Sequence, residues 1–133
     1  MGKHFSDRLR CCSYPFGSDD DQPMVMEICV GINSNDELVV SVDFHDYNNP
    51  AYNCSTAAVV NGGDARRMAR RHGVRFEELP RFVSDCMAQW RELVNPTFGQ
   101  VVSCFKEITE CLLDERCRFR VERSYGPCGF RCC

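Results

Sequence analysis

The stretch MVMEICVGINSNDELVVSVDFHD, residues 24–46, predicts a β-hairpin around which the rest of the chain is arranged. Apolar residues alternate with others through residues 24–32 and again through residues 37–46, with a polar turn at residues 33–36. Alternation with a period of two is typical of strands that bury one face, and a short turn rich in Asn and Asp suits a hairpin. Two antiparallel strands are therefore expected here.

The segments on either side of this hairpin are less regular. Residues 1–23 hold no sustained period and contain several turn formers, which predicts an irregular N-terminal arm, with a short strand suggested near residues 9–14. Residues 47–53 are dense in Asn, as in a loop, whereas residues 55–60 are small and β-branched. A third strand is therefore expected at residues 55–60.

After residue 60 the spacing of the apolar residues changes to that of helices. A short helix is predicted at residues 64–72, because Gly73 suits the end of a helix. Two longer amphipathic helices are predicted at residues 80–95 and 97–115. Three helices are thus expected to follow the three strands.

The last segment returns to the period of a strand. RFRVERSY, residues 118–125, alternates before a cysteine-containing tail at residues 126–133. The predicted order is β-β-β-α-α-α-β. One α+β domain is expected over residues 1–133, because a mostly antiparallel sheet with the helices packed on one face buries every apolar stripe.

The composition is that of an ordinary globular protein. Of the 133 residues, 44% are hydrophobic and 26% are charged, and the formal net charge of -3 provides no general attraction for nucleic acid or anionic lipid. No apolar run has the length that a signal peptide or a membrane span needs, so a cytoplasmic protein is expected. The 11 cysteines would suit a secreted disulfide scaffold, but their odd number and several helical positions favour mostly free thiols.

The cysteines fall into two groups. Cys86 and Cys111 lie on the apolar stripes of predicted helices, where burial as small hydrophobes is expected. The cysteines near the two ends are candidates for a metal site: Cys11, Cys12, Cys117, Cys128, Cys132 and Cys133. Their spacing lacks the C-x-x-C pairs that commonly hold zinc, so a structural zinc domain is an alternative and not the expectation. The first residues, MGKHFS, and the terminal Cys-Cys also match lipidation patterns.

Reactive residue types gather around the loop at residues 47–53. Alternation puts Asp43 and His45 on one face of their strand, about 7 Å apart, and Cys54 follows the loop. A thiol beside an imidazole is the arrangement by which cysteine hydrolases generate a thiolate. An open, solvated sheet face explains Asp43 and His45 more simply. Catalysis by Cys54, His45 and Asp43 is therefore the second hypothesis.

A cluster of arginines lies on and just after the predicted short helix. Its members, with no acidic residue among them, are Arg66, Arg67, Arg70, Arg71 and Arg75. Arg66 precedes Arg70 by four residues, as Arg67 precedes Arg71, and like charges at this spacing repel. Guanidinium groups pair with phosphate and carboxylate, so the expected partner is an acidic protein surface or nucleic acid. Solvated arginines, or ion pairs with acids elsewhere in the chain, remain the simpler explanation.

The sequence as a whole favours a non-enzymatic binding protein that uses the Arg-rich helix or the open sheet face. No cofactor is expected. No motif identifies a ligand, a reaction or an oligomeric state.

Overall fold

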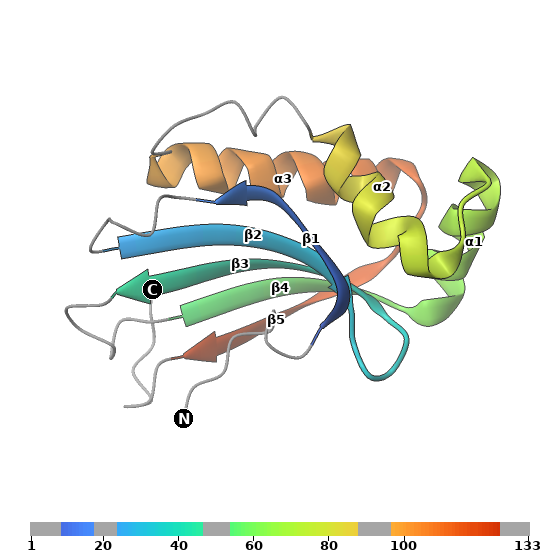
Figure 1. Cartoon of the computed structure of the whole chain (residues 1–133), viewed down its shortest axis with the longest axis horizontal. Coiled ribbons are helices and arrows are strands. Elements are labelled where there is room, and N and C mark those ends of the chain that lie inside the picture. The colour runs from blue at the N-terminus through green and yellow to red at the C-terminus, as the bar shows by residue number, and fades with distance from the viewer. Residues whose placement is uncertain (1–8, 18–23, 47–53, 88–96, 126–133) are drawn as a thin grey trace.

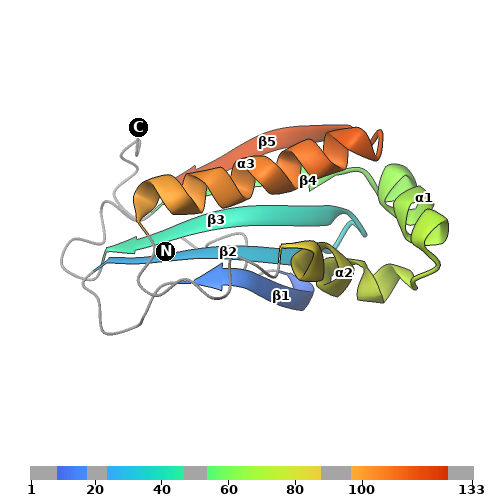
Figure 2. The ribbon, with the colours of Figure 1, turned by 90° about the horizontal axis from the view of Figure 1, so that it is seen from above.

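The structure, a computed structural model, describes residues 9–17, 24–46, 54–87 and 97–125. These residues form a five-stranded antiparallel sheet and three α-helices (Figures 1 and 2). The second and third helices cover one face of the sheet, and the first lies beyond one end of the strands. The strands lie side by side in chain order: β1 (Arg10–Gly17), β2 (Met24–Ile32), β3 (Leu38–Asp46), β4 (Cys54–Val60) and β5 (Phe119–Tyr125). The expected α+β class and its mostly antiparallel sheet are confirmed.

The strand β1 lies inside the segment that was expected to be an irregular arm. It pairs antiparallel with β2, but its register shifts twice, between Arg10 and Ser13 and between Ser13 and Phe16. Each shift interrupts the alternation of faces. The short strand suggested near residues 9–14 is therefore confirmed, and it extends further, to Gly17. Its register shifts remove the regular period by which strands are found in a sequence.

The helices begin and end at residues with clear capping roles. Helix α1 (Gly62–His72) starts after Asn61, whose side chain accepts a hydrogen bond from the Asp64 backbone N–H, and stops at Gly73, which has a φ of 67°. The stop at Gly73 was predicted, since glycine adopts this left-handed conformation without steric cost. None of the described helices is both long and apolar enough to cross a membrane.

The two later helices differ in length. A 3-10 turn, η3 (Phe76–Glu78), leads into α2 (Leu79–Cys86), which ends earlier than the sequence suggested. The rest of the helix predicted at residues 80–95 lies outside the described residues from residue 88 onward. Helix α3 (Phe98–Asp114) begins with a capping box and runs along the sheet.

The main hydrophobic core lies between the sheet and the helices. From α3 it receives Val101, Cys104, Ile108 and Leu112, which repeat at intervals of three and four residues. This stripe excludes Cys111, and both Cys111 and Cys86 are exposed. The prediction that these two cysteines are buried was wrong, because α3 presents Cys104 to the core in place of Cys111.

The opposite face of the sheet is also buried over its central strands, so it is not the open face that the sequence suggested. Val39, Ala57 and Val59 form a second cluster there, against which Leu9 packs. Gly31 on the same face permits this approach, since a Cβ at Gly31 would lie 2.7 Å from the Leu9 Cβ. Burial on this face extends to polar residues of the central strands, namely Ser41, Asp43 and Ser55.

Candidate functional site

The strand register separates the residues of the second hypothesis. Asp43 pairs with Ser55, and Phe44 pairs with Cys54. Directly opposed residues share a face, so Cys54 lies on the face of Phe44, whereas His45 occupies a position on the other face with Asp43. The register thus puts Cys54 and His45 at positions on opposite faces of the sheet.

Asp43 is held in a structural contact. It is 0% exposed, and the Ser55 hydroxyl donates a hydrogen bond to its carboxylate. A buried carboxylate needs such donors, because burial of an unpaired charge is costly. The expectation that Asp43 sits on a solvated face was therefore wrong.

Four of the described cysteines, Cys86, Cys104, Cys111 and Cys117, have thiol pKa values above the ordinary value. Burial raises the pKa of the Cys104 thiol to about 12, and partial burial followed by nearby acidic groups raises the pKa of Cys86. For Cys111 the causes are partial burial, then the neighbouring Cys86 and acidic groups. A reactive cysteine needs a lowered pKa, so these residues suit packing better than nucleophilic chemistry.

The described residues do not support the alternative of a structural zinc site. Cys117 is 1% exposed, with its Sγ 3.8 Å from the Asp64 carbonyl oxygen and 4.0 Å from the Met68 Sδ. Cys128, Cys132 and Cys133 lie outside the described residues, as does the tail at 126–133. Within the part of the chain that the structure describes, no group of three or more His, Cys, Asp and Glu side chains is placed to hold a metal ion.

The arginines of α1 and the turn after it are mostly engaged by acidic side chains. Arg66 lies 4.3 Å above the Phe76 ring and 3.4 Å from Asp36, and Arg75 lies 2.8 Å from Glu78. Arg70 is exposed on α1, without an ion pair to the other described residues. The Arg-rich helix is therefore not one uniform basic face.

A depression of about 700 Å³ lies where α1 meets the turn between α3 and β5. We call it the arginine pocket, and its lining residues are Asn61, Asp64, Arg67, Arg71, Asp114, Arg116 and Arg118. Two of its four arginines come from α1, and the other two come from the turn, nearly fifty residues later in the chain. Four arginines against two aspartates give the lining a formal charge of +2.

The turn at the end of α3 places Arg116 in the pocket. The Cys117 N–H donates to the Leu112 carbonyl and the Arg116 N–H to the Leu113 carbonyl, both at 2.9 Å. This pair of hydrogen bonds is a Schellman motif, which normally has glycine at its left-handed residue. Here Arg116 occupies that position with a φ of 60°. An arginine is held where the backbone alone favours glycine.

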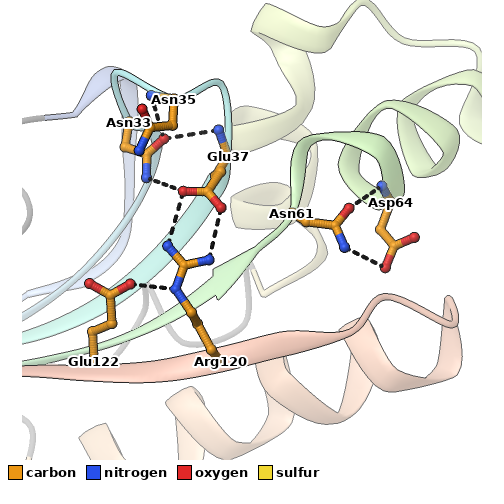
Figure 3. Close-up of polar contacts among 7 residues, drawn as sticks. All are labelled: Asn33, Asn35, Glu37, Asn61, Asp64, Arg120 and Glu122. Carbon is orange, nitrogen blue, oxygen red and sulfur yellow. Dashed lines mark hydrogen bonds and ion pairs between the residues drawn. The ribbon is translucent and has the colours of Figure 1, made fainter.

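Two contacts fasten this turn to α1. The Arg67 guanidinium donates to the Arg116 carbonyl oxygen at 2.8 Å, and the Arg118 N–H donates to the Asp64 carboxylate at 3.1 Å. Asp64 is itself positioned by Asn61, with which it exchanges two hydrogen bonds (Figure 3). The pocket therefore lies where the start of α1 is hydrogen-bonded to the residues that lead into β5.

The four guanidinium groups of the pocket differ in how far they are neutralised. Arg67 lies 3.1 Å from Asp64, and Arg71 lies 3.5 Å from Glu115. The side chains of Arg116 and Arg118 form no ion pair with any described residue, although both residues are exposed. Two guanidinium groups therefore face solvent beside two that are partly compensated.

Arg120, two residues after Arg118, has a different environment. Its guanidinium donates to both carboxylate oxygens of Glu37, at 2.8 and 3.1 Å, and to Glu122 at 2.6 Å (Figure 3). Asn33 donates a further hydrogen bond to Glu37 at 3.0 Å. We call these four residues, Asn33, Glu37, Arg120 and Glu122, the Glu37 clasp.

Sequence reasoning found half of the pocket. Arg67 and Arg71 belonged to the predicted Arg-rich helix, but Arg116 and Arg118 were missed. Their only local signal is the alternation of basic residues in ERCRFR, residues 115–120, which does not indicate proximity to α1. Comparisons with protein-family models, with curated proteins and with solved structures found no match to this chain.

Proposed function

We propose that this chain is a binding module that receives a phosphorylated side chain of a partner protein in the arginine pocket. The observation that carries the proposal is the convergence of four arginines on one depression, two of them without an acidic partner among the described residues. Guanidinium groups present forked donors that match phosphate oxygens.

The charge of the pocket supports a phosphate over a single carboxylate. A phosphate monoester bears about −1.5 to −2 at pH 7, close in size to the charge of Arg116 and Arg118, the two lining arginines without an acidic partner among the described residues. A carboxylate would compensate only half of that charge. Clusters of arginine are a recurrent means of recognising phosphorylated motifs.

The same features favour a protein partner over nucleic acid. Affinity for nucleic acid comes from many phosphate contacts along a basic track, whereas this site is one depression with Asp64 and Asp114 in its lining. The chain as a whole has a formal charge of -3. A compact phosphate on a protein segment fits this local basic site better than an extended polyanion does.

A cytoplasmic location forms part of the proposal. Cys86 and Cys111 are exposed free thiols, and such thiols persist in reducing compartments.

The test is an NMR titration of the chain with O-phosphoserine, read from the Nε–Hε signals of arginine and the backbone amides. We expect saturable shifts at Arg67, Arg116 and Arg118 and at the amides of residues 114–118. The variants Arg116→Ala and Arg118→Ala should each weaken binding about tenfold, since a charge-assisted hydrogen bond contributes about 1.5–3 kcal/mol.

The matched control is Arg81→Ala, which removes an arginine from α2 whose side chain is 84% exposed and outside the pocket lining. It should leave the titration unchanged. Equal losses in all three variants, or shifts spread over every surface arginine, would contradict the proposal. Tighter binding of a single-stranded oligonucleotide than of a phosphoserine peptide would point to nucleic acid and also contradict it.

A further inference from the structure

The two edge strands of the sheet, β1 and β5, differ in the regularity of their pairing and in what lies against them. β1 has a register that shifts twice, and α2 lies against it. β5 keeps an unbroken register with β4 from Phe119 to Tyr125, and its outer side has no strand partner among the described residues. A straight, unpaired edge of this kind presents backbone N–H and C=O groups that another strand can pair with.

Exposed apolar side chains gather beside this edge. The large hydrophobic side chains that are exposed in the described part of the chain are Val102, Leu113 and Val121. Val121 belongs to β5 and is 53% exposed. Leu113 lies about 200° around α3 from Cys111, whose thiol neighbours Cys86 of α2. The flank of α3 with Leu113 is therefore the one turned away from α2, toward β5 (Figure 2).

The charges of β5 complement a second copy of the same strand. In an antiparallel pair centred on Val121, Arg120 of each copy lies opposite Glu122 of the other. A pair centred on Arg120 or on Glu122 would put identical charges directly opposite one another, which is destabilising. Centring on Val121 also leaves the helices of both copies on the same face, since opposed residues share a face.

We propose that two copies of this chain associate through β5, with Val121 at the two-fold axis, to form one continuous ten-stranded sheet. Val121 of each copy is covered by Val121 of the other. The α3 flanks with Val102 and Leu113 then face each other across the paired strands. Such an isologous contact closes on itself and leaves no free β5 edge.

The first test is the mass of the full chain in solution by sedimentation equilibrium. We expect a dimer of roughly 30 kDa, twice the 15.2 kDa of one chain. Val121→Lys places two ammonium groups opposite each other and should raise the dissociation constant at least tenfold. Ser103→Lys adds the same charge on an exposed residue of α3 and should leave association unchanged.

The second test examines the register by crosslinking with oxidised glutathione and peptide mapping. Val121→Cys places two thiols on directly opposed residues, whose Cα atoms are about 4.5–5.5 Å apart, so an intermolecular disulfide is expected. Arg123→Cys places them four residues apart along the strands, roughly 13 Å, beyond disulfide reach.

Three outcomes would overturn the proposal. One is a monomer at millimolar protein, which would leave the edge for a strand of a different protein. Another is a dimer that withstands Val121→Lys. The third is preferential crosslinking of the Arg123→Cys variant, which would refute the register. Circular dichroism of each variant separates loss of association from loss of folding.

Discussion

Arg118 and Arg120 lie two residues apart on the segment that returns to the sheet, yet their surroundings differ. Arg120 is held by Glu37 and Glu122 in the Glu37 clasp. Arg118 lines the arginine pocket beside Arg116, and neither side chain pairs with an acidic group of the described residues. The role of an arginine is thus decided by which acids the fold brings near it. Arg120 is engaged within the fold, and Arg118 is the arginine that the proposed function assigns to the phosphate.

The largest effect is expected from Glu37→Ala. It removes two charge-assisted hydrogen bonds to Arg120 and one from Asn33. We expect the free energy of unfolding, measured by urea denaturation, to fall by about 2 kcal/mol. Glu77→Ala, at an exposed residue of η3, should change it by less than about 0.5 kcal/mol. Equal effects of the two variants would show that the Glu37 clasp does not stabilise the fold.

The pH dependence of stability should report the same clasp. Hydrogen bonds from Arg120, and then from Asn33, lower the pKa of Glu37 from 4.5 to about 2. A lowered pKa in the folded state means that the contribution is complete above about pH 4.5 and is lost as the pH falls through about 2. The difference in unfolding free energy between the native chain and Glu37→Gln should therefore be about 1–2 kcal/mol at pH 6 and shrink below pH 4. A difference that is constant from pH 6 to pH 2 would contradict this assignment.

Arg118→Ala and Arg120→Ala should have opposite consequences. Loss of Arg118 should weaken O-phosphoserine binding about tenfold, or about 1.4 kcal/mol, with an unfolding free energy within about 0.5 kcal/mol of the native value. Loss of Arg120 should lower stability and leave binding unchanged in the folded fraction. Measuring both quantities on both variants, by calorimetry and urea denaturation, decides whether the two arginines are separated as described.

The smallest effect is expected from Arg116→Gly, and this substitution should stabilise the protein. Glycine relieves the left-handed backbone at φ 60°, so stability should rise by about 0.5–1 kcal/mol while phosphoserine binding weakens. Gly73→Ala is the matched control, since Gly73 ends α1 at φ 67° and no atom lies within 4 Å of a Cβ built there. It should lower stability by a similar amount. A loss of stability in both variants would show that the Arg116 side chain stabilises the fold.

The hairpin of β2 and β3 was predictable because its alternation is local and uninterrupted. The burial of Asp43 was not, since alternation assigns residues to two faces but does not say whether a second layer covers one of them. Leu9 and the space left by Gly31 contribute to the cover of this face at Val39, and neither stands out in the sequence.

The arginine pocket was only half predictable for a different reason. Arg67 and Arg71 form a pattern within α1, but Arg116 becomes their neighbour through a contact between residues 49 positions apart. The Schellman turn at Arg116 lacks the glycine that would mark it in a sequence. Contacts of this range depend on the path of the whole chain and leave no local pattern.

The position of β5 has a consequence for the order of folding. Strands β1 to β4 each pair with the strand next to them in the chain, but β5 meets β4 only after residues 61–118, which include the three α-helices, have intervened. Bringing such distant segments together costs more loop-closure entropy than forming a hairpin, and contacts of this kind slow folding. We therefore expect hydrogen-exchange pulse labelling to find the amides of β2 and β3 protected before those of β5. The chain would then acquire Arg118 in the pocket and the free edge of β5 in the same late step, so that a nascent chain lacking its last residues has neither surface.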